Sequence, residues 1–299
     1  MRITFITSPS ENIEPYIPML ESKGIIVDKN QLHPKCDAII GSGHTGHGYR
    51  LMDAFNKILP QVPLINLTLD FYKTVWTYSN PHNYDWEFYK KVLHRCDELW
   101  CIADEVILRL GEEGLDTDRC KLMKIWSRFF DYDGEIKDKR YVLNPVRAYP
   151  YDKNYGWLKR ACGELQIPLF ETKNRVPEKE FQKIIAECSF MCTEYHEIST
   201  GGLTLLEGYN LGKVSVVSDS KYEGVRNYLG DRAIYFDDNS YDDFKRVLKE
   251  TWENTPQPDL EDCRSFCAAH PTLEDNVDFM IERLNILKAN KTTEGHKAL

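Results

Sequence analysis

The sequence predicts an α/β protein of two domains, each built on a parallel β-sheet. Three observations support this prediction. Short apolar segments alternate with longer segments of helical periodicity, which is the pattern of parallel sheets. The chain has 299 residues, enough for about two domains of roughly 150 residues each. The alternation breaks at the polar stretch Asp131–Arg140, which we interpret as a hinge.

The first half contains five short apolar segments that we predict as strands: Arg2–Thr7, Gly24–Asp28, Asp37–Gly41, Pro63–Leu69 and Glu98–Ile102. Helices are expected to fill the gaps between them. Glu87–Arg95 has a helical pattern, and a second helix over Asp104–Glu113 ends at Gly114, a residue type that commonly stops helices.

The second half repeats the alternation, beginning with a predicted strand at Arg140–Leu143. A helix is predicted after Pro177, because apolar residues recur there at spacings of three and four. The predicted elements that follow are strand Ser189–Thr193, helix Leu203–Leu211, strand Lys213–Ser218, a helix from N-cap Ser240 to about Trp252 with Asp243 at its third position, and helix Thr272–Lys288. The polar tail after Ala289 is expected to fray.

The composition argues against several classes of function. Acidic residues outnumber basic ones by 47 to 38, giving a net charge of −9, so a nucleic-acid or anionic-membrane partner is not expected. No apolar run of about 18 residues predicts a transmembrane segment, and the N-terminus lacks a signal-peptide pattern. The nine cysteines are scattered, which indicates free thiols in a reducing compartment and predicts a cytoplasmic protein.

A glycine motif, G-x-G-x-x-G, occupies Gly41–Gly46 directly after an apolar segment. A dinucleotide-binding fingerprint follows the first strand and has an acid about 20 residues later. Here the motif follows the third predicted strand, and the acid, Asp70, lies 24 residues after Gly46, further along the chain than the fingerprint requires. Three interpretations remain: the dinucleotide site of a dehydrogenase, a flexible turn, or a glycine loop facing a cleft, where backbone N–H groups and His44 or His47 meet a substrate.

A second run of small residues precedes the helix predicted at Leu203: Ser199, Thr200, Gly201 and Gly202. The first N–H groups of a helix have no partner within the helix, and the helix end carries partial positive charge. Glycines let a ligand approach closely, so this run predicts a phosphate site. One turn further, the carboxylate of Glu207 is placed to accept hydrogen bonds from ribose hydroxyls. The alternatives are a plain N-cap and an exposed helical acid.

The segment GLTLLEGYNLGKVSVVSDSKYEGVRNYLGD, residues 202–231, resembles the C-terminal signature of retaining glycosyltransferases of the GT-B fold, glycosyltransferase family 4. In that family the pattern runs loosely E-G-F-G-L-P-x-L-E-A, followed by a small-residue stop, a buried strand and a glycine-containing loop. Residues 202–207 match G-L-P-x-L-E, 212–219 match the turn and strand, and 230–237 match the closing loop and last strand. The likeness extends from about residue 98 to 287.

The resemblance implies the GT-B fold, with two Rossmann-like domains facing a cleft. Residues 1–135 would form the acceptor-side domain, onto which helix 272–288 crosses back, and residues 136–271 the donor domain. The implied reaction moves a sugar, of hexose type, from a UDP- or GDP-linked donor to a hydroxyl of a carbohydrate or other acceptor, with retained configuration. The nucleotide sugar is a co-substrate, and no cofactor and no metal is expected.

The resemblance also implies roles for particular residues. Arg147 and Lys153 match the basic pair that contacts the donor diphosphate, although each alternatively is a surface charge. Residues 199–203 and Glu207 would bind the nucleotide sugar. Two cations at the diphosphate would replace a metal. The D-x-D motif at Asp116–Asp118 is therefore predicted to be a connecting turn and not a metal site. On the acceptor side we expect Asp70 to assist, followed by the histidines His44, His47 and His82.

One position departs from the family pattern. The family usually carries a first acid eight positions before the second, and here Ser199 stands eight positions before Glu207. Glu197 or Glu194 on a reshaped loop, or Ser199 with the backbone of the following residues, would then contact the sugar. The departure favours a second hypothesis, a non-catalytic nucleotide-sugar-binding partner of another transferase. The dehydrogenase is the third.

Overall fold

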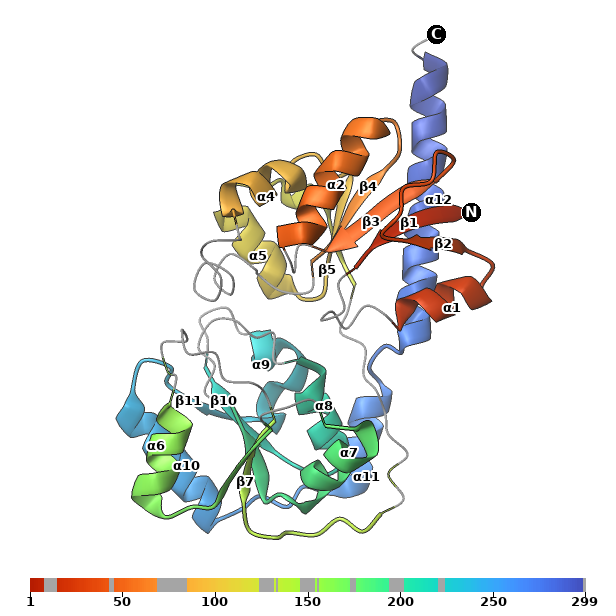
Figure 1. Ribbon diagram of the computed structural model, residues 1–299. Helices are drawn as coiled ribbons and strands as arrows, with labels where there is room; N and C mark the ends of the chain where they lie inside the picture. The colour runs from red at the N-terminus through yellow and green to blue at the C-terminus, as the bar shows by residue number, and fades with distance from the viewer. Residues whose placement is uncertain are drawn as a thin grey trace. The chain divides into compact units, whose positions relative to one another are not determined.

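The computed structural model describes residues 1–7, 15–42, 46–68, 85–123, 132, 134–145, 154, 156–172, 176–193, 202–219 and 224–297. The chain divides into two units. Unit 1 comprises Met1–Lys124 and Pro271–Leu299, and unit 2 comprises Ile125–His270. Each unit contains one parallel β-sheet with helices on both faces (Figure 1).

The sheet of unit 1 has six parallel strands in the order β2-β1-β3-β4-β5-β6. The strands are β1 (Arg2–Ile6), β2 (Ile26–Lys29), β3 (Ala38–Ser42), β4 (Leu64–Thr68), β5 (Glu98–Cys101) and β6 (Cys120–Leu122). The five predicted strands of this half are confirmed with small shifts at their ends. The chain leaves β1 for β2 on one side and returns to β3 on the other, so the strand order reverses between β1 and β3.

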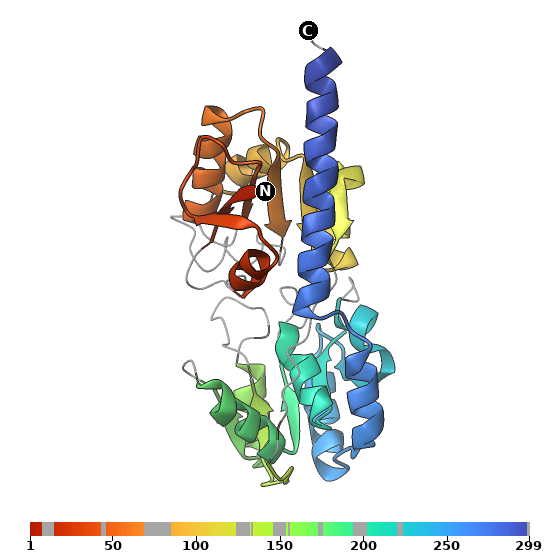
Figure 2. The same cartoon turned by 90° about the vertical axis from the view of Figure 1, so that its right-hand side faces the viewer.

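Helices cover both faces of this sheet (Figure 2). One face carries α1 (Tyr16–Ser22) and α12 (Leu273–Lys297), and the other carries α2 (Gly46–Ile58), α4 (Trp86–Leu93) and α5 (Asp104–Glu112). Strand β5 contacts the helices on both faces, because successive side chains of a strand point to opposite faces of the sheet. Trp100 meets Phe279 of α12 with ring centroids 5.8 Å apart, whereas Leu99 and Cys101 belong to the core beneath α2, α4 and α5.

Helix α12 begins with a reciprocal cap. The Asp275 N–H donates to the Thr272 hydroxyl (3.1 Å), and the Thr272 N–H donates to the Asp275 carboxylate (2.7 Å). Lys23, which follows α1, pairs with Glu274 at 2.9 Å. The prediction that the chain frays after Ala289 is wrong, since α12 continues to Lys297. Residues 289–297 contain no proline and several good helix formers, and the helix continues past Gly295.

The sheet of unit 2 has five parallel strands in the order β11-β10-β9-β7-β8. The strands are β7 (Val142–Asn144), β8 (Leu169–Glu171), β9 (Phe190–Cys192), β10 (Ser215–Ser218) and β11 (Ile234–Phe236). The strands predicted over 140–143, 189–193 and 213–218 are confirmed as β7, β9 and β10. The strand order again reverses after the first strand, here between β7 and β9.

Two layers of helices enclose this second sheet (Figure 1). One face carries α6 (Trp157–Leu165) and α10 (Tyr241–Glu253), and the other carries α7 (Glu178–Glu187), α8 (Gly202–Asn210) and α11 (Leu260–Ala268). The short helix α9 (Gly224–Leu229) follows β10. The predicted cap of α10 is confirmed, since the Ser240 hydroxyl accepts from the Asp243 N–H at 3.1 Å. Phe236 and Phe244 pack at 4.7 Å in the core beneath α6 and α10.

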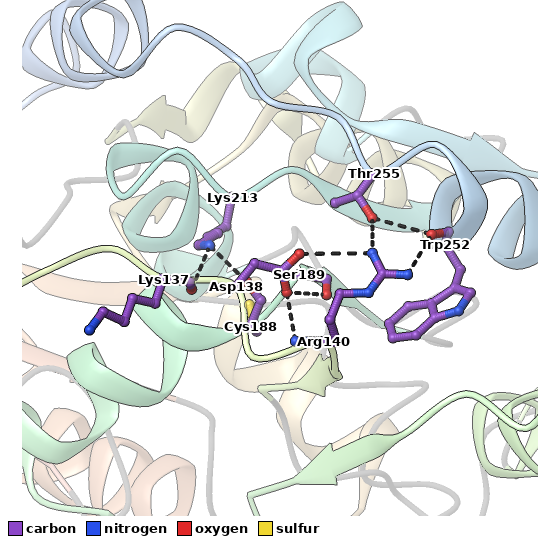
Figure 3. A network of polar contacts seen from close by, with 8 residues as sticks. All are labelled: Lys137, Asp138, Arg140, Cys188, Ser189, Lys213, Trp252 and Thr255. Carbon is purple, nitrogen blue, oxygen red and sulfur yellow. Dashed lines mark hydrogen bonds and ion pairs between the residues drawn. The ribbon is translucent and has the colours of Figure 1, made fainter.

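The segment before β7 is joined to unit 2 by a polar network at the amino ends of the strands (Figure 3). Asp138 accepts from the Ser189 hydroxyl at 2.6 Å. The buried ammonium of Lys213 donates to the carbonyl of Cys188 (2.7 Å) and that of Lys137 (3.4 Å). Burial lowers the pKa of Lys213, and these bonds compensate its ammonium for the lost water.

Arg140 completes this network by lying over the ring of Trp252, 4.1 Å from the ring centroid. Backbone N–H groups of Lys137 and Lys139 also bond to carbonyls at the end of α7. These contacts join residues 137–140, the end of the predicted hinge, to unit 2. Residues 137–140 accordingly belong to unit 2, which spans Ile125–His270.

Candidate functional site

The carboxyl ends of β7 and β9 define the candidate site of unit 2. In open parallel sheets, ligands bind outside the carboxyl ends of the strands, at the point where the strand order reverses. In unit 2 this point lies where β7 ends at Asn144 and β9 ends at Cys192. The predicted site residues that follow these two strands in the sequence lie outside the described residues: Arg147, Lys153, Ser199, Thr200 and Gly201.

Helix α8 carries the described part of the predicted nucleotide site. The helix begins at Gly202, one residue before the start that the sequence predicts at Leu203. Glu207 lies in its second turn, and only 6% of the residue is exposed. Glu207 is therefore not the exposed helical acid of the alternative interpretation. A carboxylate is rarely this deeply buried, so Glu207, on the helix that follows β9, is a functional candidate.

A close contact between helix and strand fixes the position of α8. A Cβ atom added at Gly208 would lie 2.6 Å from the sulfur of Met191 on β9, and closer still to its terminal methyl. An alanine at position 208 would have to displace the flexible end of the Met191 side chain. Because Gly208 follows Glu207 directly, this packing against β9 helps to place the backbone from which the Glu207 carboxylate extends.

Asn154 is a buried residue at this site to which the sequence analysis assigned no role. Its side-chain amide donates to the carbonyl of Asp238, just beyond β11, at 3.0 Å. Its own carbonyl accepts from the Trp157 N–H at 3.0 Å, in the turn that leads into α6. The signal in the sequence was its place directly after Lys153, one of the two predicted diphosphate ligands.

A paired arginine, which the sequence analysis also missed, lies beyond the end of β10. Arg226 on α9 makes two hydrogen bonds to the carboxylate of Asp219, at 2.9 and 3.2 Å. The hydrogen bond to Asp219 raises the pKa of Arg226. Its guanidinium also lies 3.9 Å from the ring centroid of Tyr235. With its charge already balanced by Asp219, Arg226 is a weaker diphosphate candidate than Arg147 or Lys153.

In unit 1 the structure explains the first glycine of the G-x-G-x-x-G motif by packing. Gly41 lies in β3, and an added Cβ would be 2.6 Å from Cγ of Met52 on α2 and 3.4 Å from Cβ of Ile6. Gly46 is the first residue of α2, and residues 43–45 lie outside the described part. The motif follows the third strand of the chain, whereas a dinucleotide fingerprint follows the first.

A buried hydrogen-bond network lies under the carboxyl ends of β3 and β4. The side-chain oxygen of Asn66 accepts from the hydroxyls of Thr68 (2.8 Å) and Tyr89 (2.9 Å), and its amide reaches the Gly41 carbonyl at 3.4 Å. Asn66 and Thr68 were detectable in the sequence as polar residues within an apolar strand. The network fixes the end of the strand that precedes Asp70.

The acceptor-side candidates are placed only in part. His47 is exposed at the start of α2, whereas Asp70, His44 and His82 lie outside the described residues. Asp116–Asp118 forms the predicted turn, in which Asp116 accepts from the Asp118 N–H at 3.1 Å. Among the residues that the structure describes, no group of three or more metal-ligating side chains comes together.

No protein-family model and no curated protein sequence matches the chain. Several solved structures are similar to it. Sucrose-phosphate synthase from Thermosynechococcus elongatus shares 10% identity at a TM-score of 0.73, covering 97% of this chain and 100% of that one. Anabaena HepE, in complex with UDP and glucose, shares 11% identity at a TM-score of 0.67, covering 95% and 99%. The apo form of the lipopolysaccharide outer core galactosyltransferase WaaB shares 11% at 0.65, covering 93% and 98%.

At sequence identities of 10–11%, these structural similarities establish the fold alone. The chain has the two parallel-sheet α/β units of GT-B glycosyltransferases, so the predicted fold class is confirmed. In the part of the chain that the structure describes, no helix is both long and apolar enough to cross a membrane.

Proposed function

We propose that the protein is a retaining glycosyltransferase that moves a hexose from a UDP- or GDP-linked donor to a hydroxyl acceptor, without a metal. The observation that carries the proposal is the buried carboxylate of Glu207 beside the reversal point of the unit 2 sheet. The sequence around Glu207 resembles the donor-site signature of this class. The fold is shared with glycosyltransferases, one of which is described in complex with UDP and glucose.

In this proposal Glu207 binds the two ribose hydroxyls of the donor, and the start of α8 binds its phosphates. A carboxylate that accepts two hydrogen bonds fits a pair of neighbouring hydroxyls, since each oxygen has free lone pairs. Residues 199–203 supply N–H groups and small side chains to the phosphates and the sugar. Ser199 takes the place of the family's first acid at the transferred sugar.

Arg147 and Lys153 are the proposed catalytic cations. The reaction accumulates negative charge on the departing diphosphate. A helix N-terminus contributes only about 0.3–1 kcal/mol, and a hydrogen bond to a charged group about 1.5–3 kcal/mol, whereas catalysis requires a barrier lowered by about 8–23 kcal/mol. The two cations therefore supply much of the electrostatic stabilisation, and the positioning of donor and acceptor supplies the rest.

Unit 1 is proposed to bind the acceptor. The departing phosphate takes the proton of the attacking hydroxyl on the same face of the sugar, which retains the anomeric configuration. Asp70 assists by accepting a hydrogen bond from the acceptor. The buried network around Asn66 supports this role, because it fixes the end of β4 two residues before Asp70.

The test is release of UDP or GDP from a panel of nucleotide sugars, with and without carbohydrate acceptors. We expect turnover with at least one donor, and an NMR assignment of the product should show the donor's anomeric configuration. Lys153→Met should lower turnover by about 10²–10³-fold, the effect of removing one donor to a developing anion. Lys249→Met is the matched control, because Lys249 is an exposed lysine on α10 paired with Glu253.

Two other outcomes would redirect the assignment. Tight binding of UDP or GDP without turnover of any donor would indicate the alternative, a non-catalytic nucleotide-sugar-binding partner. Stabilisation against heat by NAD, and none by UDP or GDP, would indicate the dehydrogenase instead, since a ligand raises the melting temperature only if it binds the folded state.

A further inference from the structure

Helix α8, which carries Glu207, lies alongside α11 on one face of the unit 2 sheet (Figure 1). Two contacts join the helices on either side of Glu207 in the sequence. The thiol of Cys267 donates to the Leu206 carbonyl at 3.6 Å, and both groups are buried. The rings of Tyr209 and Phe266 meet edge to face, with centroids 5.5 Å apart and planes at 88°. Helix α11 therefore holds the backbone of α8 immediately before and after the buried acid.

Phe266 is the most firmly placed of these residues on α11. The guanidinium of Arg232 lies 3.9 Å from its ring centroid, and the ring of His270 lies 4.8 Å away. On the other helix, Tyr209 is held at both ends of its side chain, because its ring meets Phe266 and its hydroxyl is hydrogen-bonded to the thiol of Cys263. An edge-to-face ring pair and a hydrogen bond both depend on direction, so together they fix the orientation of Tyr209.

The contact of α8 with the sheet does not set the rotation of the helix about its own axis. There Gly208, which has no side chain, meets the flexible side chain of Met191. Successive residues of a helix are about 100° apart, so Glu207 and Tyr209 lie on opposite flanks of α8, with Gly208 between them. The contacts of Tyr209 with α11 therefore set the rotation of α8, and with it the direction in which Glu207 extends.

A small rotation of α8 would be enough to disturb a hydrogen bond made by Glu207. The side chains of a helix reach about 5–6 Å from its axis, so a rotation of about 10° moves the end of a side chain by about 1 Å. Hydrogen bonds between two oxygen atoms span only about 2.5–3.0 Å. A displacement of this size therefore weakens or breaks such a bond.

We infer that Phe266 is a positioning residue for the donor ribose, acting on Glu207 through Tyr209 and the backbone of α8. The inference rests on the proposed function, in which the Glu207 carboxylate binds the two ribose hydroxyls. Phe266 itself does not contact the nucleotide. Its ring holds α8 at the rotation that directs the carboxylate at both hydroxyls, so the preference of the site for ribose over 2′-deoxyribose depends on a residue of α11.

The test compares a nucleoside diphosphate with its 2′-deoxy form, by calorimetric titration of wild type and Phe266→Ala. The ligands are UDP and 2′-deoxy-UDP, or GDP and 2′-deoxy-GDP, whichever diphosphate binds the wild type. We expect Phe266→Ala to reduce the preference for the ribose form by about fivefold, part of what one hydrogen bond to a charged group contributes. A purely structural role would weaken both ligands equally, because a less stable fold does not distinguish them.

A matched control is Phe170→Ala. Phe170 on β8 also packs against a tyrosine of unit 2, Tyr141, with ring centroids 5.7 Å apart, and this variant should keep the full preference for ribose. If Phe266→Ala does not fold, as judged by circular dichroism, Phe266→Leu is used. Leucine keeps an apolar side chain between the helices and removes the edge-to-face contact with Tyr209.

A double-mutant cycle checks that the effect passes through the carboxylate. In a Glu207→Leu background the preference for ribose should be absent, and Phe266→Ala should weaken diphosphate binding no further. Equal losses for the two ligands, or additive losses in the cycle, would overturn the inference and leave the proposed function standing. A wild-type protein that binds both ligands equally, or neither, would overturn the proposed role of Glu207 together with the inference.

Discussion

The two units share the arrangement of their first three strands and differ in the residue at the sixth position of the helix that follows the third strand. In each sheet the first strand lies between the second and the third, and the third strand leads into a helix that begins with glycine: β3 into α2 in unit 1, and β9 into α8 in unit 2. The sixth residue is Leu51 in α2 and the buried acid Glu207 in α8. Asp53 of α2, at the eighth position, is also buried and pairs with Lys57 and Arg95.

A tight helix–strand contact occurs in both units with its two residues exchanged. In unit 1 the glycine is on the strand, Gly41, and the methionine on the helix, Met52. In unit 2 the methionine is on the strand, Met191, and the glycine on the helix, Gly208. Glycines near a strand–helix turn are therefore needed for packing in both units, and they do not by themselves indicate a nucleotide. A buried carboxylate at the sixth position of this helix distinguishes unit 2 from unit 1.

The largest expected effect comes from making unit 2 resemble unit 1. Glu207→Leu should weaken the binding of UDP or GDP by about 100-fold, because it removes the acceptor of both ribose hydroxyls. The reciprocal change, Leu51→Glu, should leave this affinity unchanged. Calorimetric titration of both variants measures the effect, with Glu250→Gln, an exposed acid on α10, as control. Equal losses in the two reciprocal variants would remove the distinction between the units.

A smaller effect is expected from filling the two glycine contacts. Gly41→Ala should lower the free energy of unfolding by about 1–3 kcal/mol, because its new methyl group meets Cγ of Met52, near the backbone. Gly208→Ala should be less destabilising. Its methyl group meets chiefly the flexible end of Met191, and alanine is favoured over glycine in a helix by about 1 kcal/mol.

Thermal unfolding of each variant measures this difference. Gly163→Ala on α6 is the control that should stabilise, since nothing lies within 4 Å of an added Cβ there. In a Met52→Ala background the loss from Gly41→Ala should shrink, because the clashing atoms are gone. A Gly41→Ala protein as stable as the wild type would show that β3 and α2 separate easily, and the packing account of the motif would fail.

The smallest effect concerns the caps of α10 and α12. A hydrogen bond from the Asp237 N–H, then one from Arg246, holds the pKa of Asp243 below its ordinary value of 3.8. The Thr272 N–H and hydroxyl likewise hold the pKa of Asp275 below 3.8. A carboxyl group with a depressed folded pKa stabilises the protein above its unfolded pKa, and this contribution is lost as the pH falls through the folded value.

Asp243→Asn should therefore lower the melting temperature by about 2–4 °C at neutral pH, the loss of one cap. The difference from the wild type should shrink as the pH falls from about 5 to 2. Asp275→Asn should behave in the same way for unit 1. Melting curves across this pH range provide the check, and a difference that stays constant with pH would show that the carboxylate charge is not responsible.

Much of the fold could be predicted because buried parallel strands are short and mostly apolar, as β1, β3, β4 and β5 of unit 1 are. The missed strands, β6 and β8, lie at sheet edges, where burial is incomplete and the apolar signal is weak; Phe170 of β8 is exposed. The end of α12 is not predictable from polarity, because polar residues such as Lys and Glu are good helix formers and no proline follows Ala289.

The candidate site was predictable only where chemistry follows from local sequence. Glu207 and the start of α8 stand within one motif, so their proximity could be read directly. The contact of Asn154 with the Asp238 carbonyl joins residues far apart in the chain, and no periodicity indicates it. The meaning of Gly41 was missed for the same reason, since its partner Met52 becomes visible only once β3 and α2 are packed together.

A crystal structure of the protein with UDP or GDP tests the central claim most directly. The account predicts the ribose against Glu207 and the diphosphate at the carboxyl ends of β7 and β9, next to the chain that leads to Asn154. A nucleotide bound instead beside Gly41 and the start of α2, with Glu207 distant from it, would contradict the account.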